Sequence, residues 1–295
     1  MKKSIIFCLC MAVVVMFTSC NKDHDGIYNP SKKIQKVYTV ENGERQLAEV
    51  WNWNGNLLNT IESYEDGSNS ATCRFYYTDN LLISISKGRS GANFNYEGKK
   101  VHYIEVDYYT PSGEKVSVAD YYFNYNGSKL TQIKIIDYVS LEDKESQLNP
   151  LKYVIPQNYA EIENIVEKCL KEAKGEVNIT MNLTWKGKNV TSVEIIQNSV
   201  SSAQTTSITY LTENTFDNQK NPLKCFLAGL FEVTEVNNMY YNQNNILTST
   251  TKEGNVVINS TKNVYEYEDE YPVKVTSTTS YPDETEKVET YIYEY

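Results

Sequence analysis

The sequence is poor in the residues that build most metal and nucleophilic sites. It has two histidines among 295 residues, His24 and His102, and six scattered cysteines. A histidine-based zinc site or a Ser-His-Asp triad would have to be built around His102, because His24 lies in a polar segment near the N-terminus. No catalytic or cofactor motif is recognisable elsewhere. We therefore expect no cofactor, no metal and no enzymatic activity.

Basic residues and long apolar runs are also scarce. Lys and Arg total 28 against 38 Asp and Glu, which gives a formal net charge of -10. An acidic balance argues against nucleic acid and anionic lipid headgroups as partners, because both require a positive surface. Beyond the N-terminus, no segment offers the ~20 apolar residues that a membrane-spanning helix requires.

The first 19 residues have the three parts of an export signal. Two lysines precede an apolar stretch at residues 5–17, which is too short to span a bilayer comfortably, and small polar residues then precede Cys20. This junction resembles the lipobox of bacterial lipoproteins, in which the cysteine is acylated, with palmitate among the chains, and becomes the mature first residue. Phe17 stands where leucine is usual. The alternative is an ordinary signal peptide with a chance cysteine.

Residues 20–35 then read as a lipidated cysteine followed by a flexible, acid-rich tether. Several acyl chains on Cys20 would attach the protein to the membrane durably, since each buried methylene contributes about 0.8 kcal/mol. Three cysteines remain after the anchor, Cys73, Cys169 and Cys225. Their number and spacing predict no disulfide framework, and the sequence does not determine any pairing among them.

Residues 36–295 repeat one pattern, in which two aromatic residues separated by one position lead through a polar turn to an aliphatic strand. Examples are Trp51–Trp53 before Gly55 and Phe123–Tyr125 before Gly127. Asn-Gly pairs between alternating segments predict hairpins with type I′ turns. We therefore predict a single all-β domain, an antiparallel up-and-down meander that forms a wide curved sheet or barrel.

Two stretches interrupt the β pattern. Between Pro156 and Gly175, apolar residues recur at helical spacing, which predicts one inserted amphipathic helix at about 158–174. Further on, 216–223 contains Asn221-Pro222 and leads into an apolar run that ends at Phe231. Because proline cannot occupy a central strand, we predict a loop or short helix there that covers a hydrophobic opening.

The leader, the aromatic hairpins, the Asn-Pro segment at 216–223 and the Tyr-Pro-Val-Lys sequence at 271–274 together resemble an uncharacterised Bacteroidetes lipoprotein family. That family is described as a domain of unknown function with a porin-like fold. The resemblance covers most of the mature chain and implies fold rather than chemistry. The acidic residues after Cys20 are similar to the signal that sends such lipoproteins to the outer face of the outer membrane, although a solvated linker would have the same composition.

Three classes of function are compatible with these patterns. The first is a binding module for a glycan or peptide, for which tyrosine, with 25 copies, offers flat rings with a hydroxyl. The candidate ligand-binding residues are Tyr108, Tyr109, Tyr121 and Tyr122. Each could instead stabilise the sheet through cross-strand pairs. The sequence determines neither the ligand nor the oligomeric state.

The second class is a hydrolase that uses paired carboxylates, with Asp107 and Asp120 predicted on neighbouring strands. Ordinary solvated carboxylates would give the same pattern, as would the acidic run at 266–270, which lacks the spacing of a calcium loop. The third class is an outer-membrane pore. Charged residues in the middle of strands and a mean hydropathy of -0.51 argue against a lipid-facing band.

Overall fold

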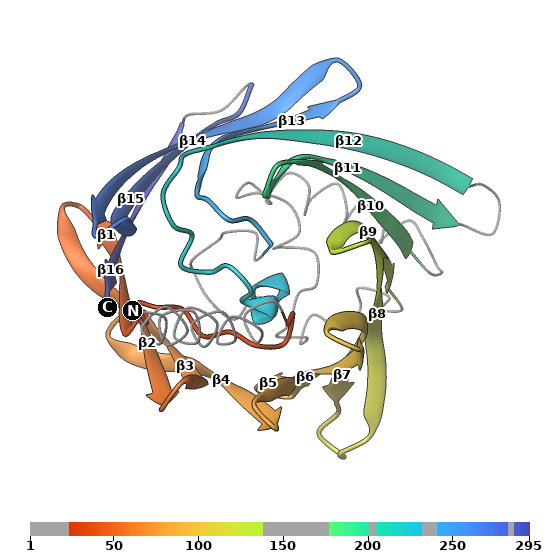
Figure 1. The fold of residues 1–295 in the computed structure, drawn as a ribbon, viewed down its shortest axis with the longest axis horizontal. Coiled ribbons are helices and arrows are strands. Elements are labelled where there is room, and N and C mark those ends of the chain that lie inside the picture. Colours follow the sequence, from red (N-terminus) through yellow and green to blue (C-terminus); the bar gives the residue numbers. More distant parts are fainter. Residues whose placement is uncertain (1–23, 138–176, 201–204, 232–240, 283–285) are drawn as a thin grey trace, which may run out of the picture.

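The computed structural model describes residues 24–137, 177–200, 205–231, 241–282 and 286–295. These residues form a ring of antiparallel strands around a central segment (Figure 1). The strands are β1 (Lys36–Glu41), β2 (Glu44–Asn54), β3 (Leu57–Glu65), β4 (Ser68–Thr78), β5 (Leu81–Lys87), β6 (Ser90–Glu97), β7 (Lys100–Tyr109), β8 (Lys115–Asn126), β9 (Lys129–Asp137), β10 (Val177–Lys186), β11 (Asn189–Val200), β12 (Thr205–Phe216), β13 (Ile246–Glu253), β14 (Val256–Glu268), β15 (Tyr271–Ser280) and β16 (Lys287–Glu294).

The sheet is a closed barrel. Each strand pairs with its neighbours in sequence, and β1 pairs with both β2 and β16, where Lys36 lies opposite Glu294. Closure leaves no free sheet edge, which removes the template for edge-to-edge aggregation that a long open meander would present. The predicted all-β, up-and-down barrel is confirmed.

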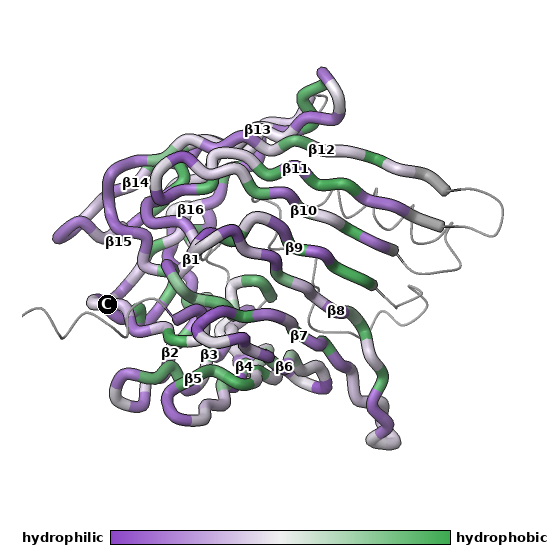
Figure 2. The backbone as a smooth tube through the Cα atoms, turned by 45° about the vertical axis from the view of Figure 1, so that its right-hand side comes forward, coloured by the Kyte–Doolittle hydropathy of each residue, from purple (hydrophilic) through white to green (hydrophobic). Residues whose placement is uncertain are grey.

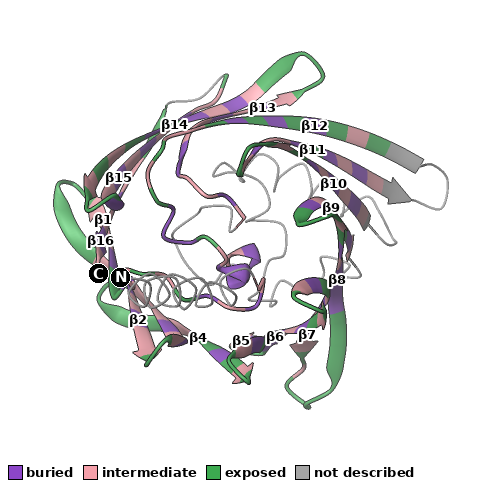
Figure 3. Cartoon of the chain, in the orientation of Figure 1, coloured by how far each residue is buried: buried purple, intermediate pink, exposed green. Residues whose placement is uncertain are grey.

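Alternation along the strands fixes which residues face inward. In β8, Ala119, Tyr121 and Phe123 are buried, whereas Asn124 is exposed. Figure 3 shows the same alternation of buried and exposed residues around the ring. Because side chains alternate between the two faces of a strand, one register places the whole apolar set in the barrel interior.

The hairpin turn at Asn42-Gly43 has the predicted positive φ at both central residues, 51° and 84°, but the turn at Asn54-Gly55 differs from the predicted type. Asn54 still pairs with Leu57, so the central residues of that turn are Gly55 and Asn56, and the positive φ of 60° belongs to the glycine. Positive φ at the first central residue is the pattern of a type II′ turn, so the type I′ prediction was wrong here. The register of this hairpin makes Asn54 the last paired residue of its strand, so the glycine takes the first central position of the turn.

The repeated aromatic residues join adjacent hairpins. One aromatic residue of a repeat donates a hydrogen bond from its ring N–H or O–H to a backbone carbonyl of the preceding hairpin or of the chain before it. We call these contacts the aromatic clasps. They join Trp53 to Ile34 (2.7 Å), Tyr77 to Leu58 (2.9 Å), Tyr96 to Leu82 (2.7 Å), Trp185 to Leu130 (2.6 Å), Tyr265 to Ile246 (2.9 Å) and Tyr295 to Pro272 (2.7 Å). The abundance of tyrosine therefore has a structural cause in much of the barrel.

The connection from β12 to β13 turns back into the ring of strands (Figure 1). Its residues 222–231, which we call the plug, include a short 3-10 helix, η2 (Leu227–Leu230). Phe226 packs against Trp51 and Phe75, with ring centroids 5.3 and 6.1 Å away, and Phe231 lies 5.5 Å from Tyr121. The predicted loop or short helix over a hydrophobic opening is confirmed.

Residues 24–35 cross the same end of the barrel, which we call the plug end. Tyr28 and Ile34 are buried, and the Tyr28 hydroxyl donates to the carbonyl oxygen of Pro222 at 2.9 Å. The part of the predicted flexible tether that the structure describes is therefore packed, because these two apolar side chains fill space between the plug and the barrel wall.

Other predictions fall outside the described residues. They are the leader at 1–19, Cys20 itself, the helix at about 158–174 and Cys169. Cys73 and Cys225, which the structure describes, are not joined by a disulfide. No helix among the described residues is long and apolar enough to cross a membrane.

Candidate functional site

The outer wall of the barrel carries a row of polar side chains from β8 to β11. Asn124 donates to Gln132 (3.0 Å), Gln132 to Asn182 (2.9 Å), and Asn182 to Glu194 (2.9 Å), so four side chains form one chain of hydrogen bonds across β8 to β11. We call this the outer polar ladder. Figure 2 shows hydrophilic and hydrophobic residues interspersed along the strands. A lipid-facing band would instead place apolar side chains outward on every strand.

The four candidate tyrosines do not form one patch. Tyr121 is fully buried against the plug, and Tyr108 packs partly against the core. Tyr109 is 43% exposed on the outside. Tyr122 donates to Asp120 at 3.4 Å on the outer wall. The four side chains thus divide between the two faces of the barrel wall, and their role in binding stays a prediction.

The two candidate carboxylates lie on neighbouring strands, as predicted. Asp120 pairs with Glu105 in register and accepts a hydrogen bond from Tyr103 at 2.7 Å, while Asp107 forms an ion pair with Lys115 at 3.0 Å. Burial raises the pKa of Asp107, and the Lys115 ammonium opposes that shift. Asp120 and the Oδ2 of Asp107 have neighbouring donors, whereas the Oδ1 of Asp107 is buried without a hydrogen-bond partner among the described residues.

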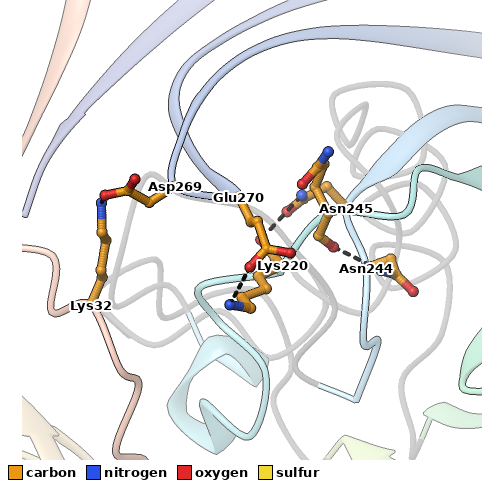
Figure 4. Close-up of polar contacts among 7 residues, drawn as sticks. Lys32, Lys220, Asn244, Asn245, Asp269 and Glu270 are labelled. Atoms are coloured by element: carbon orange, nitrogen blue, oxygen red, sulfur yellow. Dashed lines mark hydrogen bonds and ion pairs between the residues drawn. The ribbon is translucent and has the colours of Figure 1, made fainter.

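The acidic run at 266–270 is used in ion pairs at the plug end. Asp269 lies 2.9 Å from Lys32, and Glu270 lies 2.6 Å from Lys220 (Figure 4). These pairs tie the β14–β15 turn to the N-terminal segment and to the loop before the plug. Among the described residues, no group of three or more His, Cys, Asp or Glu side chains could hold a metal ion.

A second cluster fixes the base of the plug loop. Both oxygens of Asp217 accept hydrogen bonds from Asn245, at 3.0 Å from its backbone N–H and 3.1 Å from its side chain, and Asp217 also accepts from the Tyr267 hydroxyl. Asn244 and Asn245 donate in turn to the carbonyls of Gln219 and Lys220 (Figure 4). Asp217 therefore closes the loop by joining its two ends.

The plug end also contains a pocket of about 420 Å³. Four lysines and three aromatic residues converge on it from different elements, together with Asp25 and Cys225. The lysines and aromatics are Lys100, Lys129, Lys188, Lys224, Tyr125, Trp185 and Tyr241. Such a set combines apolar ring surface with a few charged groups, which is typical of small-molecule sites.

The pocket lies where the row of aromatic clasps is interrupted. Tyr125 occupies a clasp position, but its hydroxyl donates to the Asp25 carboxylate at 2.7 Å rather than to a backbone carbonyl. The same carboxylate oxygen accepts from the backbone N–H of Val101 at 3.0 Å. Burial, followed by the negative charge of Asp25, raises the pKa of Tyr125, so this hydroxyl remains a donor at neutral pH.

The plug backbone shapes the other side of the pocket. Cys225 has a φ of 68°, in the left-handed region that L side chains rarely adopt. The residues on either side point to different environments, because Lys224 is exposed and Phe226 is buried in the barrel. The turn at Cys225 thus allows one short segment to close the lumen and to supply a cation to the pocket.

Sequence reasoning missed this pocket. Its lysines lie in turns and strand ends 29 to 124 residues apart, as Lys100, Lys129 and Lys224 show, and no local pattern joins them. The one available signal was the second aromatic of each repeat, since Tyr125 and Trp185 both lie directly before hairpin turns. Placing those turns at one barrel end required the strand order.

Comparison with known proteins gave solved structures alone. No family model matches the chain, and no curated protein matches it. The chain is similar to a porin-like protein from Bacteroides vulgatus ATCC 8482, at 11% identity and a TM-score of 0.49, over 89% of this chain and 98% of that one. It is also similar to a porin-like protein from Bacteroides uniformis ATCC 8492, at 11% identity and a TM-score of 0.47, over 90% and 98% of the two chains.

Proposed function

We propose that the protein is a lipoprotein of the outer membrane, anchored through Cys20, whose barrel lies outside the bilayer on the cell exterior and acts as a non-catalytic binding module. The outer polar ladder supports this proposal most directly. Four polar side chains in a row on the outer wall would be costly against lipid tails, which offer no hydrogen-bond partners.

The filled interior also favours a binding module over a channel. Phe226, Phe231 and Tyr28 are buried at the plug end, and the residues they contact belong to the inner wall of β2, β4, β6 and β8. On the side of the barrel that the plug contacts, an apolar interior and a polar exterior give the arrangement of a water-soluble domain, the reverse of a porin. With an anchor on Cys20, attachment to the membrane requires no strand to enter it.

Membrane extraction of a Cys20→Ala variant tests the anchor and the barrel together. Without the acyl acceptor, we expect the secreted protein to leave the membrane fraction in alkaline carbonate. Cys10→Ala, which changes another cysteine of the leader, is the matched control and should remain attached. A Cys20→Ala protein that still required detergent for release would contradict the proposal and would favour a membrane-embedded barrel.

The closed sheet itself favours a second candidate, an outer-membrane pore, because closed barrels are the β structures that cross bilayers. The purified protein would then conduct ions after insertion into planar lipid bilayers. On the binding-module proposal, we expect no channel activity, and removal of plug side chains should not create it.

A further inference from the structure

The pocket at the plug end is a local concentration of positive charge on an acidic protein. The chain has a formal net charge of -10, yet four lysines and one carboxylate line this pocket. Their ammonium groups come from β7, β9, the β10–β11 turn and the plug, so no single strand or turn accounts for the cluster. Bringing like charges together is unfavourable unless an anion neutralises them.

Two of the lysines are held by the aromatic residues of the pocket. The Lys100 ammonium lies 4.5 Å from the centre of the Tyr125 ring, and the Lys129 ammonium lies 5.7 Å from that of Trp185. These cation–π contacts fix both charges at the pocket wall. Lys188 and Lys224 are exposed and form no ion pair with any residue that the structure describes, so their charges are available to a ligand.

The aromatic wall is fixed in advance. Trp185 donates its indole N–H to the carbonyl of Leu130, and its ring lies 5.9 Å from that of Tyr241 at an angle of 56°. A flat ligand that packs on these rings would not have to order them first, which reduces the entropic cost of binding. Asp25 accepts hydrogen bonds from Tyr125 and Val101 through one oxygen, so its negative charge is held at the pocket wall and is outnumbered by the four lysines.

We propose that this pocket binds an acidic saccharide, with the carboxylate or phosphate of the sugar on Lys188 and Lys224 and the face of its ring against Trp185 and Tyr241. The inference rests on the proposed function of a binding module and names its ligand class. Lysine binds carboxylates and phosphates through charge-assisted hydrogen bonds, while the aromatic rings offer apolar surface to the C–H face of a sugar.

The place of the pocket bears on the source of the ligand. Asp25 lies five residues after Cys20, and five residues of extended chain span at most ~18 Å. An anchor on Cys20 would therefore keep the pocket close to the membrane surface. Both a free acidic polysaccharide and the headgroup of an acidic glycolipid present the same chemistry to the lysines and aromatic rings.

Calorimetric titration of the secreted Cys20→Ala protein with an oligogalacturonate, and with an uncharged galactan oligosaccharide of matched length, tests the ligand class. Binding of the acidic oligosaccharide alone, weakened about 10-fold by Lys188→Gln and again by Lys224→Gln, would support the proposal. Lys262→Gln, on the outer wall of β14, is the matched control and should leave the affinity unchanged.

Flotation with phosphatidylcholine vesicles that carry an acidic glycolipid provides the second arm. Binding to these vesicles but not to pure phosphatidylcholine, with the same loss in the lysine variants, would support a membrane-borne source. Absence of binding in both arms, or equal binding of the uncharged sugar, would overturn the proposal. Neither result would affect the extraction test, so the binding-module and anchor hypotheses can fail separately from the ligand class.

Discussion

The inner wall of the barrel has two unlike regions. From β2 to β11 the buried residues are mainly aliphatic and aromatic, as in Leu58, Ile85, Phe94 and Ile133, whereas from β12 to β15 serine, threonine and asparagine predominate. Members of the polar region lie opposite one another in register, and Thr212 pairs with Thr251 through hydroxyls 3.0 Å apart. The two regions of one closed sheet are thus stabilised by different interactions.

The plug explains the apolar region. Its two phenylalanines make ring contacts with Trp51, Phe75, Phe94 and Tyr121, all on the apolar side. The polar region depends instead on cross-strand hydrogen bonds, and among the described residues Ser249 and Asn259 each have a buried polar atom without a partner. A hydrogen bond contributes less net stability than burial of a large aromatic side chain. The apolar region should therefore dominate the stability of the barrel.

The largest expected effect follows from removal of the plug anchor. Phe226→Ala would leave a cavity among Tyr28, Trp51 and Phe75 and should lower the free energy of unfolding by about 3–5 kcal/mol. Denaturation in urea, followed by circular dichroism, measures this loss. Val264→Ala, at an outer position of β14 that is 57% exposed, is the control and should change little. If the two substitutions lowered the free energy of unfolding equally, the plug would contribute no more to stability than an exposed position on the outer wall.

Loss of the Asp217 contacts that join the two ends of the β12–β13 connection should cause the next largest loss of stability. Asp217→Asn removes the charge from an acceptor that serves Asn245, Gln219 and Tyr267, and we expect a loss of about 1.5–3 kcal/mol in the free energy of unfolding. Asp269→Asn breaks the exposed ion pair with Lys32 and is the matched control, for which no measurable change is expected. If Asp217→Asn left the free energy of unfolding unchanged, the two ends of the plug loop would be held together without this carboxylate.

Substitutions in the polar region should lower the free energy of unfolding by less, and the effects of paired substitutions should not add. Thr212→Val leaves the Thr251 hydroxyl without its partner and should cost about 1 kcal/mol, whereas the double variant Thr212→Val/Thr251→Val should be close to wild type. A double-mutant cycle from urea denaturation measures the coupling. Additive losses would indicate that each hydroxyl has another essential partner and that the two regions are less different than their composition indicates.

The smallest effect concerns pH and the N-terminal segment. Burial lowers the pKa of His24 from its ordinary value of 6.5, and its Nδ1 accepts a hydrogen bond from the Gly26 N–H at 3.3 Å. The unfolded or undocked segment takes up a proton more readily than the docked one, so docking is fully stable above about pH 6.5 and weakens as the pH falls below it.

Hydrogen exchange of the Leu82 amide, which donates to the Gly26 carbonyl at 3.0 Å, reports on this docking once it is corrected for the intrinsic pH dependence of exchange. Protection should decline modestly between pH 7 and pH 5 in the wild type but not in His24→Gln. Constant protection in both proteins would exclude His24 as the cause.

Much of the fold could be predicted because its signals are local. Period-two alternation in 177–185 and glycine at the hairpin turns identify strands and their ends without reference to distant residues. The turn type was wrong at Asn54-Gly55 because the pairing of Asn54 with Leu57, which decides the central residues of the turn, is set by the register of the whole hairpin. The candidate tyrosines were chosen for exposure, yet Tyr121 is buried, because the face of a strand that turns inward depends on closure.

The sequence by itself determined the repeating hairpins and the proline-containing interruption at the start of the plug, since each is a pattern of neighbouring residues, while the export leader with Cys20 stays a prediction. Tertiary structure alone decided barrel closure between Lys36 and Glu294, the aromatic clasps and the pocket. The physical reason is sequence separation. Asp25 meets Tyr125 across 100 positions, and only the completed ring of strands brings such residues within hydrogen-bonding distance.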